Sequence, residues 1–75
     1  MAKYTLIDTF NNVVVSRHRT LKAAARADLA LNRAVKRHNG PTSYLPTKIT
    51  CDGENLDDDE HELLCAYLAG YLPVK

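Results

Sequence analysis

The pattern of apolar and polar positions in the first twenty residues predicts a β-hairpin. Residues 3–10 and 13–19 are rich in β-branched and aromatic side chains, which favour strands. Between them, Asn11 and Asn12 tolerate the positive φ angles of a tight turn. A two-residue loop and a four-residue loop would give different cross-strand pairs, so the face that points inward stays open.

A long helix and a third strand are predicted next. Thr20 can cap a helix through its hydroxyl, and residues 21–39 are rich in Ala and Leu and contain no Gly or Pro. The sequence Asn39-Gly40-Pro41 is a strong helix stop. Residues 43–51 have strand character, and Pro46, which has no amide hydrogen, places that strand at a sheet edge.

The last third of the chain predicts a turn and a second helix. Asp52-Gly53 marks the turn, and Asp57 with Glu60 fits a capping box at the start of the helix. Acidic residues crowd the first turns, where the helix dipole favours negative charge. Apolar residues then recur at spacings of three and four until Pro73 ends the helix: Leu63, Leu64, Tyr67, Leu68, Tyr71 and Leu72.

These elements predict a single α+β domain over residues 1–75, with the order β-β-α-β-α. The long helix returns the chain across the sheet, so we expect strand three antiparallel to strand one. The result is a three-stranded antiparallel sheet of order 2-1-3, covered by two helices. A chain of 75 residues buries only about 60–65% of its unfolded surface, so we expect marginal stability.

The chain carries signs of a cytoplasmic protein. A charge follows Met1 before any apolar run forms, so we expect no signal peptide. No stretch approaches the roughly 18 apolar residues of a membrane helix, so we expect no membrane partner. Cys51 and Cys65 are too few for a secreted disulfide scaffold, and free cysteines are usually buried, so we expect both in the core.

Charge is divided unevenly along the chain. Residues 1–48 hold nine Lys and Arg against two acids, a net charge of +7, whereas residues 49–75 hold seven acids against Lys75, a net charge of −6. One interpretation is a polyanionic partner for the basic part. The other is that the acidic segment neutralises the basic one within the fold.

The cations of the long helix fall on one side of it. At about 100° per residue, five of them form a stripe: Lys22, Arg26, Arg33, Lys36 and Arg37. The expected core side holds Leu21, Ala24, Leu31 and Val35. Asp28 and Asn32 also fall near the core side, and we expect them at its margin, bonded to the hairpin.

A stripe of like charges gains nothing for folding, but it suits a polyphosphate. Arg predominates, and its planar fork matches phosphate oxygens. Two further arginines at the hairpin exit widen the surface. The predicted nucleic-acid-binding residues are therefore Arg17, Arg19, Lys22, Arg26, Arg33, Lys36 and Arg37. Two alternatives stay open, namely a protein-contact surface and the ordinary solvated face of an amphipathic helix.

The sequence predicts no enzyme, no metal and no cofactor. His61 and Cys65 are spaced i,i+4 and Cys51 precedes them, but paired Cys-x-x-Cys elements of a zinc site are absent. The acidic run after Leu56 lacks the glycine of a calcium loop. Phosphate-binding, hydrolase and metalloprotease motifs are also absent.

The aromatic residues give a weaker signal. Tyr4, Phe10 and Tyr44 lie on predicted strands, where we expect core packing rather than base stacking. No motif matches a known family. The sequence thus predicts a small non-enzymatic protein that binds nucleic acid or another polyanion. The alternative is a protein-interaction module, for example a bacterial or phage accessory or inhibitory protein, with a homodimer among its possible states.

Overall fold

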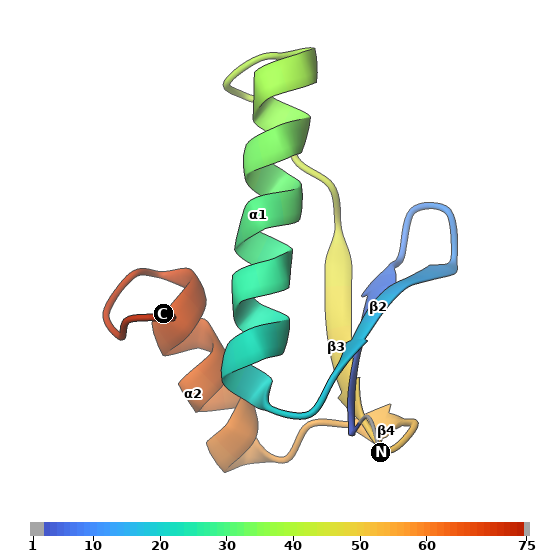
Figure 1. Ribbon diagram of the computed structural model, residues 1–75, viewed down its shortest axis with the longest axis vertical. Coiled ribbons are helices and arrows are strands. Elements are labelled where there is room, and N and C mark those ends of the chain that lie inside the picture. Colours follow the sequence, from blue (N-terminus) through green and yellow to red (C-terminus); the bar gives the residue numbers. More distant parts are fainter. Residues whose placement is uncertain (1–2, 75) are drawn as a thin grey trace.

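The computed structural model describes residues 3–74, which form four strands and two helices in an α+β fold (Figure 1). Lys75, counted above with the acidic part, lies outside the described residues. The elements are β1 (Tyr4–Asp8), β2 (Val13–His18), α1 (Leu21–Asn39), β3 (Thr47–Cys51), β4 (Glu54–Asn55) and α2 (Asp58–Leu68). Both helices lie on the same side of the sheet (Figure 1).

The strands form one antiparallel sheet of order β2-β1-β3-β4. The prediction that strand three lies beside strand one is confirmed, but the described sheet has four strands rather than three. Asp52 and Gly53, with φ angles of 52° and 84°, form a two-residue turn that folds β4 back onto β3. The prediction of an edge position for β3 is therefore wrong: Pro46 precedes the strand, where its missing amide disturbs no ladder bond.

The hairpin has a four-residue turn over residues 9–12, with Asn12 in the left-handed region at φ 57°. Its register shifts between Leu6 and Ile7, which leaves Val15 as the extra residue of a β-bulge on β2. On β1, Tyr4, Leu6 and Asp8 are buried. This alternation settles the inward face, which the sequence left open.

The bounds of α1 agree with the prediction. The Thr20 hydroxyl accepts a hydrogen bond from the Ala23 amide at 3.1 Å, and Gly40, with φ 109°, follows the last turn. The buried residues of α1 are Leu21, Ala24, Ala25 and Asp28. From residue 29 to residue 39, every side chain is half-buried or exposed.

Asp28 and Asn32 tie α1 to the segment that enters β3, not to the hairpin as expected. The Thr47 hydroxyl donates to Asp28 Oδ1 at 2.7 Å, and Asn32 Nδ2 donates to the same oxygen at 3.2 Å. The Leu45 amide donates to Asn32 Oδ1 at 3.1 Å. A buried carboxylate is thus satisfied by neutral donors, and the loop before β3 is fixed to the helix.

Helix α2 begins as predicted but differs in the partner of Glu60. The Asp57 carboxylate accepts a hydrogen bond from the Glu60 amide at 2.8 Å, which caps the helix. The Glu60 carboxylate accepts a hydrogen bond from the buried Tyr4 hydroxyl of β1. This bond raises the pKa of Tyr4 to about 12 and joins α2 to the sheet.

Helix α2 ends at Leu68, earlier than its apolar spacing predicts. Gly70 has φ 86°, and the Tyr71 amide donates to the Ala66 carbonyl at 2.9 Å. The Gly70 amide donates to the Tyr67 carbonyl at 3.2 Å, which completes a Schellman motif. Tyr71 is consequently 84% exposed rather than part of an apolar helix face.

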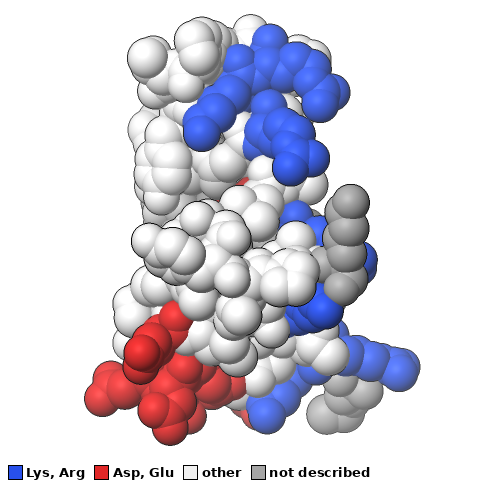
Figure 2. Space-filling view, turned by 90° about the vertical axis from the view of Figure 1, so that its left-hand side faces the viewer, with Lys and Arg blue, Asp and Glu red and all other residues white. Residues whose placement is uncertain are grey.

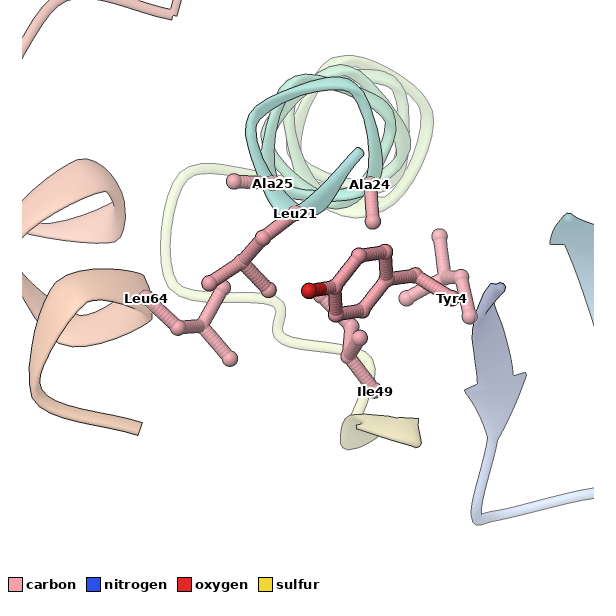
Figure 3. Close-up of a cluster of buried hydrophobic side chains, with 7 residues drawn as sticks. Tyr4, Leu21, Ala24, Ala25, Ile49 and Leu64 are labelled. Atoms are coloured by element: carbon pink, nitrogen blue, oxygen red, sulfur yellow. The ribbon is translucent and has the colours of Figure 1, made fainter. Parts of the chain in front are cut away.

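The core lies where the two helices meet the sheet. Figure 3 shows Leu21 of α1 and Leu64 of α2 directed toward Tyr4 of β1 and Ile49 of β3. The full cluster of buried apolar residues is Tyr4, Leu6, Leu21, Ala24, Ala25, Ile49 and Leu64. Core packing is confirmed for Tyr4 but is wrong for Phe10 and Tyr44, which are exposed.

The cysteines are less buried than expected. Cys65 is exposed and Cys51 is half-buried, and both are free thiols. Within residues 3–74, neither helix is long and apolar enough to cross a membrane.

Candidate nucleic-acid interface

The cations of the predicted stripe lie on the solvent side of α1. Arg26, Arg33, Lys36 and Arg37 are exposed, and Lys22 is half-buried. The three that follow residue 28, namely Arg33, Lys36 and Arg37, are called here the cationic cluster. They project from the part of α1 where the side chains are half-buried or exposed, so the helix presents them to solvent.

Val74 lies beside the lower end of the stripe. Val74 packs against the core and lies with Lys22, Ala23 and Arg26 around a shallow hollow of about 150 Å³. In Figure 2, Lys and Arg atoms accordingly form one area at the top of the molecule and further areas along the right-hand edge. The lower part of the stripe therefore shares its surface with Val74.

The acidic residues do not cover the cationic cluster. Figure 2 shows most of the Asp and Glu atoms at the lower left of this face, away from the Lys and Arg atoms at the top, with only a small red area just below those upper atoms. Asp28, the sole acid in the sequence of α1, is buried beside Thr47. Among residues 3–74, the hydrogen bonds to carboxylates come from backbone amides and neutral side chains.

Helix dipoles account for part of this charge separation. The last turn of α1 carries Lys36, Arg37 and His38, and the first turn of α2 carries Asp58, Asp59 and Glu60. Each such charge stabilises its helix end by about 0.3–1 kcal/mol. Arg33 lies before the last turn, so the helix dipole does not explain why a cation stands at this position.

The structure separates the two hairpin arginines from each other. Arg17 pairs with Thr5 across the sheet, and Thr5 alternates with the buried residues of β1. Cross-strand partners share a face, so Arg17 lies on the sheet face that points away from the helices. Lys48, paired with Ile7, lies on that same face. Arg19 is exposed in the link before α1, three residues before Lys22, the first cation of the stripe.

Two exposed aromatic residues lie near the upper end of α1. Phe10 is 77% exposed and Tyr44 is 69% exposed. Both line one hollow of about 370 Å³, together with Val35 and Asn39 of α1. Lys36 and Tyr44 line a second hollow of about 280 Å³. Strand propensity placed both rings in the core, whereas Phe10 lies in the hairpin turn and Tyr44 in the irregular segment before β3.

The thiol and imidazole groups form no metal centre in the described part of the chain. Cys65 Sγ lies 3.7 Å from His61 Nε2 on α2, at a cleft of about 370 Å³ that also borders Lys48 and Asn55. Cys51 is directed toward Asp52, and burial raises the pKa of its thiol. Within residues 3–74, His, Cys, Asp and Glu side chains do not gather in a group of three suited to a metal ion.

Comparison with known proteins adds no functional assignment. No family model matches this chain, and no curated protein or solved structure matches it either. Charge distribution and exposed side chains are therefore the observations that bear on its function.

Proposed function

We propose that this protein binds nucleic acid through the cations of α1, above all the cationic cluster of Arg33, Lys36 and Arg37. The observation that carries the proposal is the placement of these residues. They are exposed on the half of the helix that contributes little to the core, and the acidic end of α2 lies elsewhere (Figure 2).

The physical reason is the repulsion within the cluster. Arg33 and Arg37 are four residues apart on one helix, where like charges destabilise it by about 0.2–0.5 kcal/mol. A phosphate backbone relieves this repulsion and releases counterions as it binds. Arginine also presents paired donors that match phosphate oxygens. The expected affinity is sequence-tolerant and strongly dependent on salt.

Fluorescence anisotropy with labelled duplex DNA, single-stranded DNA and RNA tests the proposal. With three phosphate contacts, affinity should fall about 20- to 40-fold between roughly 50 and 200 mM salt. The double variant R33Q/R37Q should lower the slope of log affinity against log salt by about 1.4 to 1.8. Absence of binding to all three probes at low salt would reject the proposal.

A matched control separates a local interface from overall charge. R17Q/K48Q also removes two positive charges, but from the sheet face that points away from the helices. This variant should bind more tightly than R33Q/R37Q and keep most of the wild-type salt dependence. Equal losses for the two double variants would show that only net charge matters, which contradicts an interface on α1.

A second candidate function is self-association, favoured by the exposed apolar edge of the sheet. Strand β2 is an edge strand, and Val13, Val14 and Val15 on it are between 42% and 52% exposed. Free backbone groups on such a strand can pair with a second copy. Sedimentation at several concentrations tests this, with Val14→Lys as the variant that should weaken a dimer. A monomer at every concentration would contradict it.

A further inference from the structure

The hollow that Phe10 and Tyr44 line exposes two aromatic rings, and the charge distribution of the surface does not explain why they are exposed. Two aromatic rings are normally buried in a small domain, because each covers a large apolar area. Here both rings are mostly in solvent and line the same hollow, Phe10 from the hairpin turn and Tyr44 from the irregular segment before β3. Its volume of about 370 Å³ falls within the roughly 300–1,000 Å³ range of small-ligand sites.

Hydrogen bonds hold the turn that carries Phe10. The Asp8 carboxylate accepts bonds from the Phe10 amide at 2.9 Å, the Asn11 amide at 3.1 Å and Asn11 Nδ2 at 2.8 Å. The Thr9 amide and hydroxyl each donate to the Pro46 carbonyl at 3.0 Å. The turn is therefore tied to the segment that carries the other ring.

The segment that carries Tyr44 is fixed to α1 in turn. The Leu45 amide donates to the Asn32 side chain, and the Ser43 hydroxyl donates to the Asn39 carbonyl at 2.8 Å. Both rings therefore sit on anchored backbone, so a planar ligand that stacks on them orders little additional chain.

Two asparagine side chains and one lysine lie beside the Tyr44 ring, and these groups suit a nucleotide. Tyr44 borders one hollow with Phe10 and Asn39 and a second hollow with Lys36 and Asn32. Lys36 belongs to the cationic cluster. An aromatic surface beside amides and a cation offers stacking to a base, hydrogen bonds to its edge and charge to its phosphate.

We propose that the Phe10–Tyr44 hollow binds an unpaired nucleobase while Lys36 and its neighbouring arginines contact the flanking phosphates, so that the ligand is single-stranded nucleic acid. This inference rests on the proposed function and narrows its ligand. A base within a duplex is stacked on both faces and would have to leave the helix to reach the rings.

Two probes with the same number of phosphates separate base contacts from charge: a labelled single strand of about 12 nucleotides and an abasic strand of the same length. A duplex that contains the single strand carries about twice as many phosphates, and it tests whether the base must be unpaired. We expect the single strand to bind more tightly than the abasic strand and the duplex. Tyr44→Ala and Phe10→Ala should each weaken single-strand binding by about 5- to 150-fold and leave the affinity for the abasic strand unchanged.

Two further variants make the test specific. Tyr71→Ala removes another exposed tyrosine, on the segment after α2, and should leave every affinity unchanged. Tyr44→Phe keeps a ring that can stack and should retain most of the single-strand affinity. Circular dichroism confirms that each variant is folded, as expected for exposed positions.

The possible failures are distinct. Binding to none of the probes would overturn the proposed function itself. Single-strand binding that is no tighter than abasic-strand binding, and that Tyr44→Ala and Phe10→Ala leave unchanged, would overturn the base site and leave the charge-based function standing. If these two variants changed only the sedimentation of the protein, the hollow would be a contact between copies, and the base site would also be overturned.

Discussion

The two halves of α1 differ in what they contribute to the molecule. The first half, residues 21–28, lies against the sheet and α2, and it supplies Leu21, Ala24 and Ala25 to the core (Figures 1 and 3). The second half, residues 29–39, extends beyond α2 in Figure 1 and carries half-buried or exposed side chains, including the cationic cluster.

This difference shows how a short chain can combine folding with a charged surface. Its core is concentrated at one end, where β1, β3 and both helices meet. The other end of α1 packs against the core through the half-buried Leu31, and hydrogen bonds to Asn32 and Asn39 tie it to the Tyr44 segment. Three of the five cations of α1 therefore lie in the half that contributes least to the core.

The largest expected effect comes from truncating a leucine in the first half of α1. Leu21→Ala should lower the free energy of unfolding by about 2–5 kcal/mol, because it leaves a cavity in the core. Leu29→Ala, the same change in the second half, should cost roughly 1 kcal/mol or less. Urea unfolding followed by circular dichroism measures both. Similar losses for the two variants would show that the halves do not differ.

A smaller effect is expected at the bond that joins β1 to α2. Tyr4→Phe removes the hydroxyl that donates to Glu60 and should cost about 1.5–3 kcal/mol, the usual range for a hydrogen bond to a charged group. The aromatic ring stays in the core, so the loss isolates the bond.

The Tyr4 contribution should also depend on pH. Because folding raises the pKa of Tyr4 from 10.0 to about 12, the bond stabilises the protein fully below pH 10. That stabilisation is lost as the pH rises from about 10 to about 12. The difference in unfolding free energy between the wild type and Tyr4→Phe should therefore narrow over this range. A difference that stays constant would contradict the raised pKa.

The smallest effect on stability is expected in the second half of α1. R33Q/R37Q removes a like-charge pair, which stabilises the helix, and one favourable charge near its C-terminus, which destabilises it. These contributions nearly cancel, so the unfolding free energy should change by about 0.5 kcal/mol or less. Together with the binding measurements, this result would separate the residues that bind from those that fold the chain.

Caps and turn residues in the sequence predicted the bounds of α1 and the hairpin turn, because these features depend on residues close together in the chain. Thr20 and Gly40 bounded α1, and the asparagines placed the hairpin turn. The two-residue strand β4 has too few positions to show an alternating pattern. The end of α2 was misplaced because the apolar spacing continues past Gly70, whereas its left-handed backbone ends the helix.

The burial of individual side chains depends on tertiary contacts, which local sequence patterns do not predict. The apolar periodicity of α1 runs through Leu31 and Val35, so it could not show that burial is concentrated before residue 29. Strand propensity likewise placed Phe10 and Tyr44 in the core, although neither lies in a strand. The side of the helix that carries the cations was predictable, but the aromatic neighbours of Lys36 were not.

The bulged edge strand has a consequence for the behaviour of the protein at high concentration. Three successive valines on an uncovered strand are the kind of segment that seeds fibrils. The bulge at Val15 interrupts the regular backbone that a stacking chain needs. Arg17 and Arg19, just after the valines, would repel identical strands laid in register. We therefore expect these two arginines to oppose aggregation whether or not the protein binds a ligand.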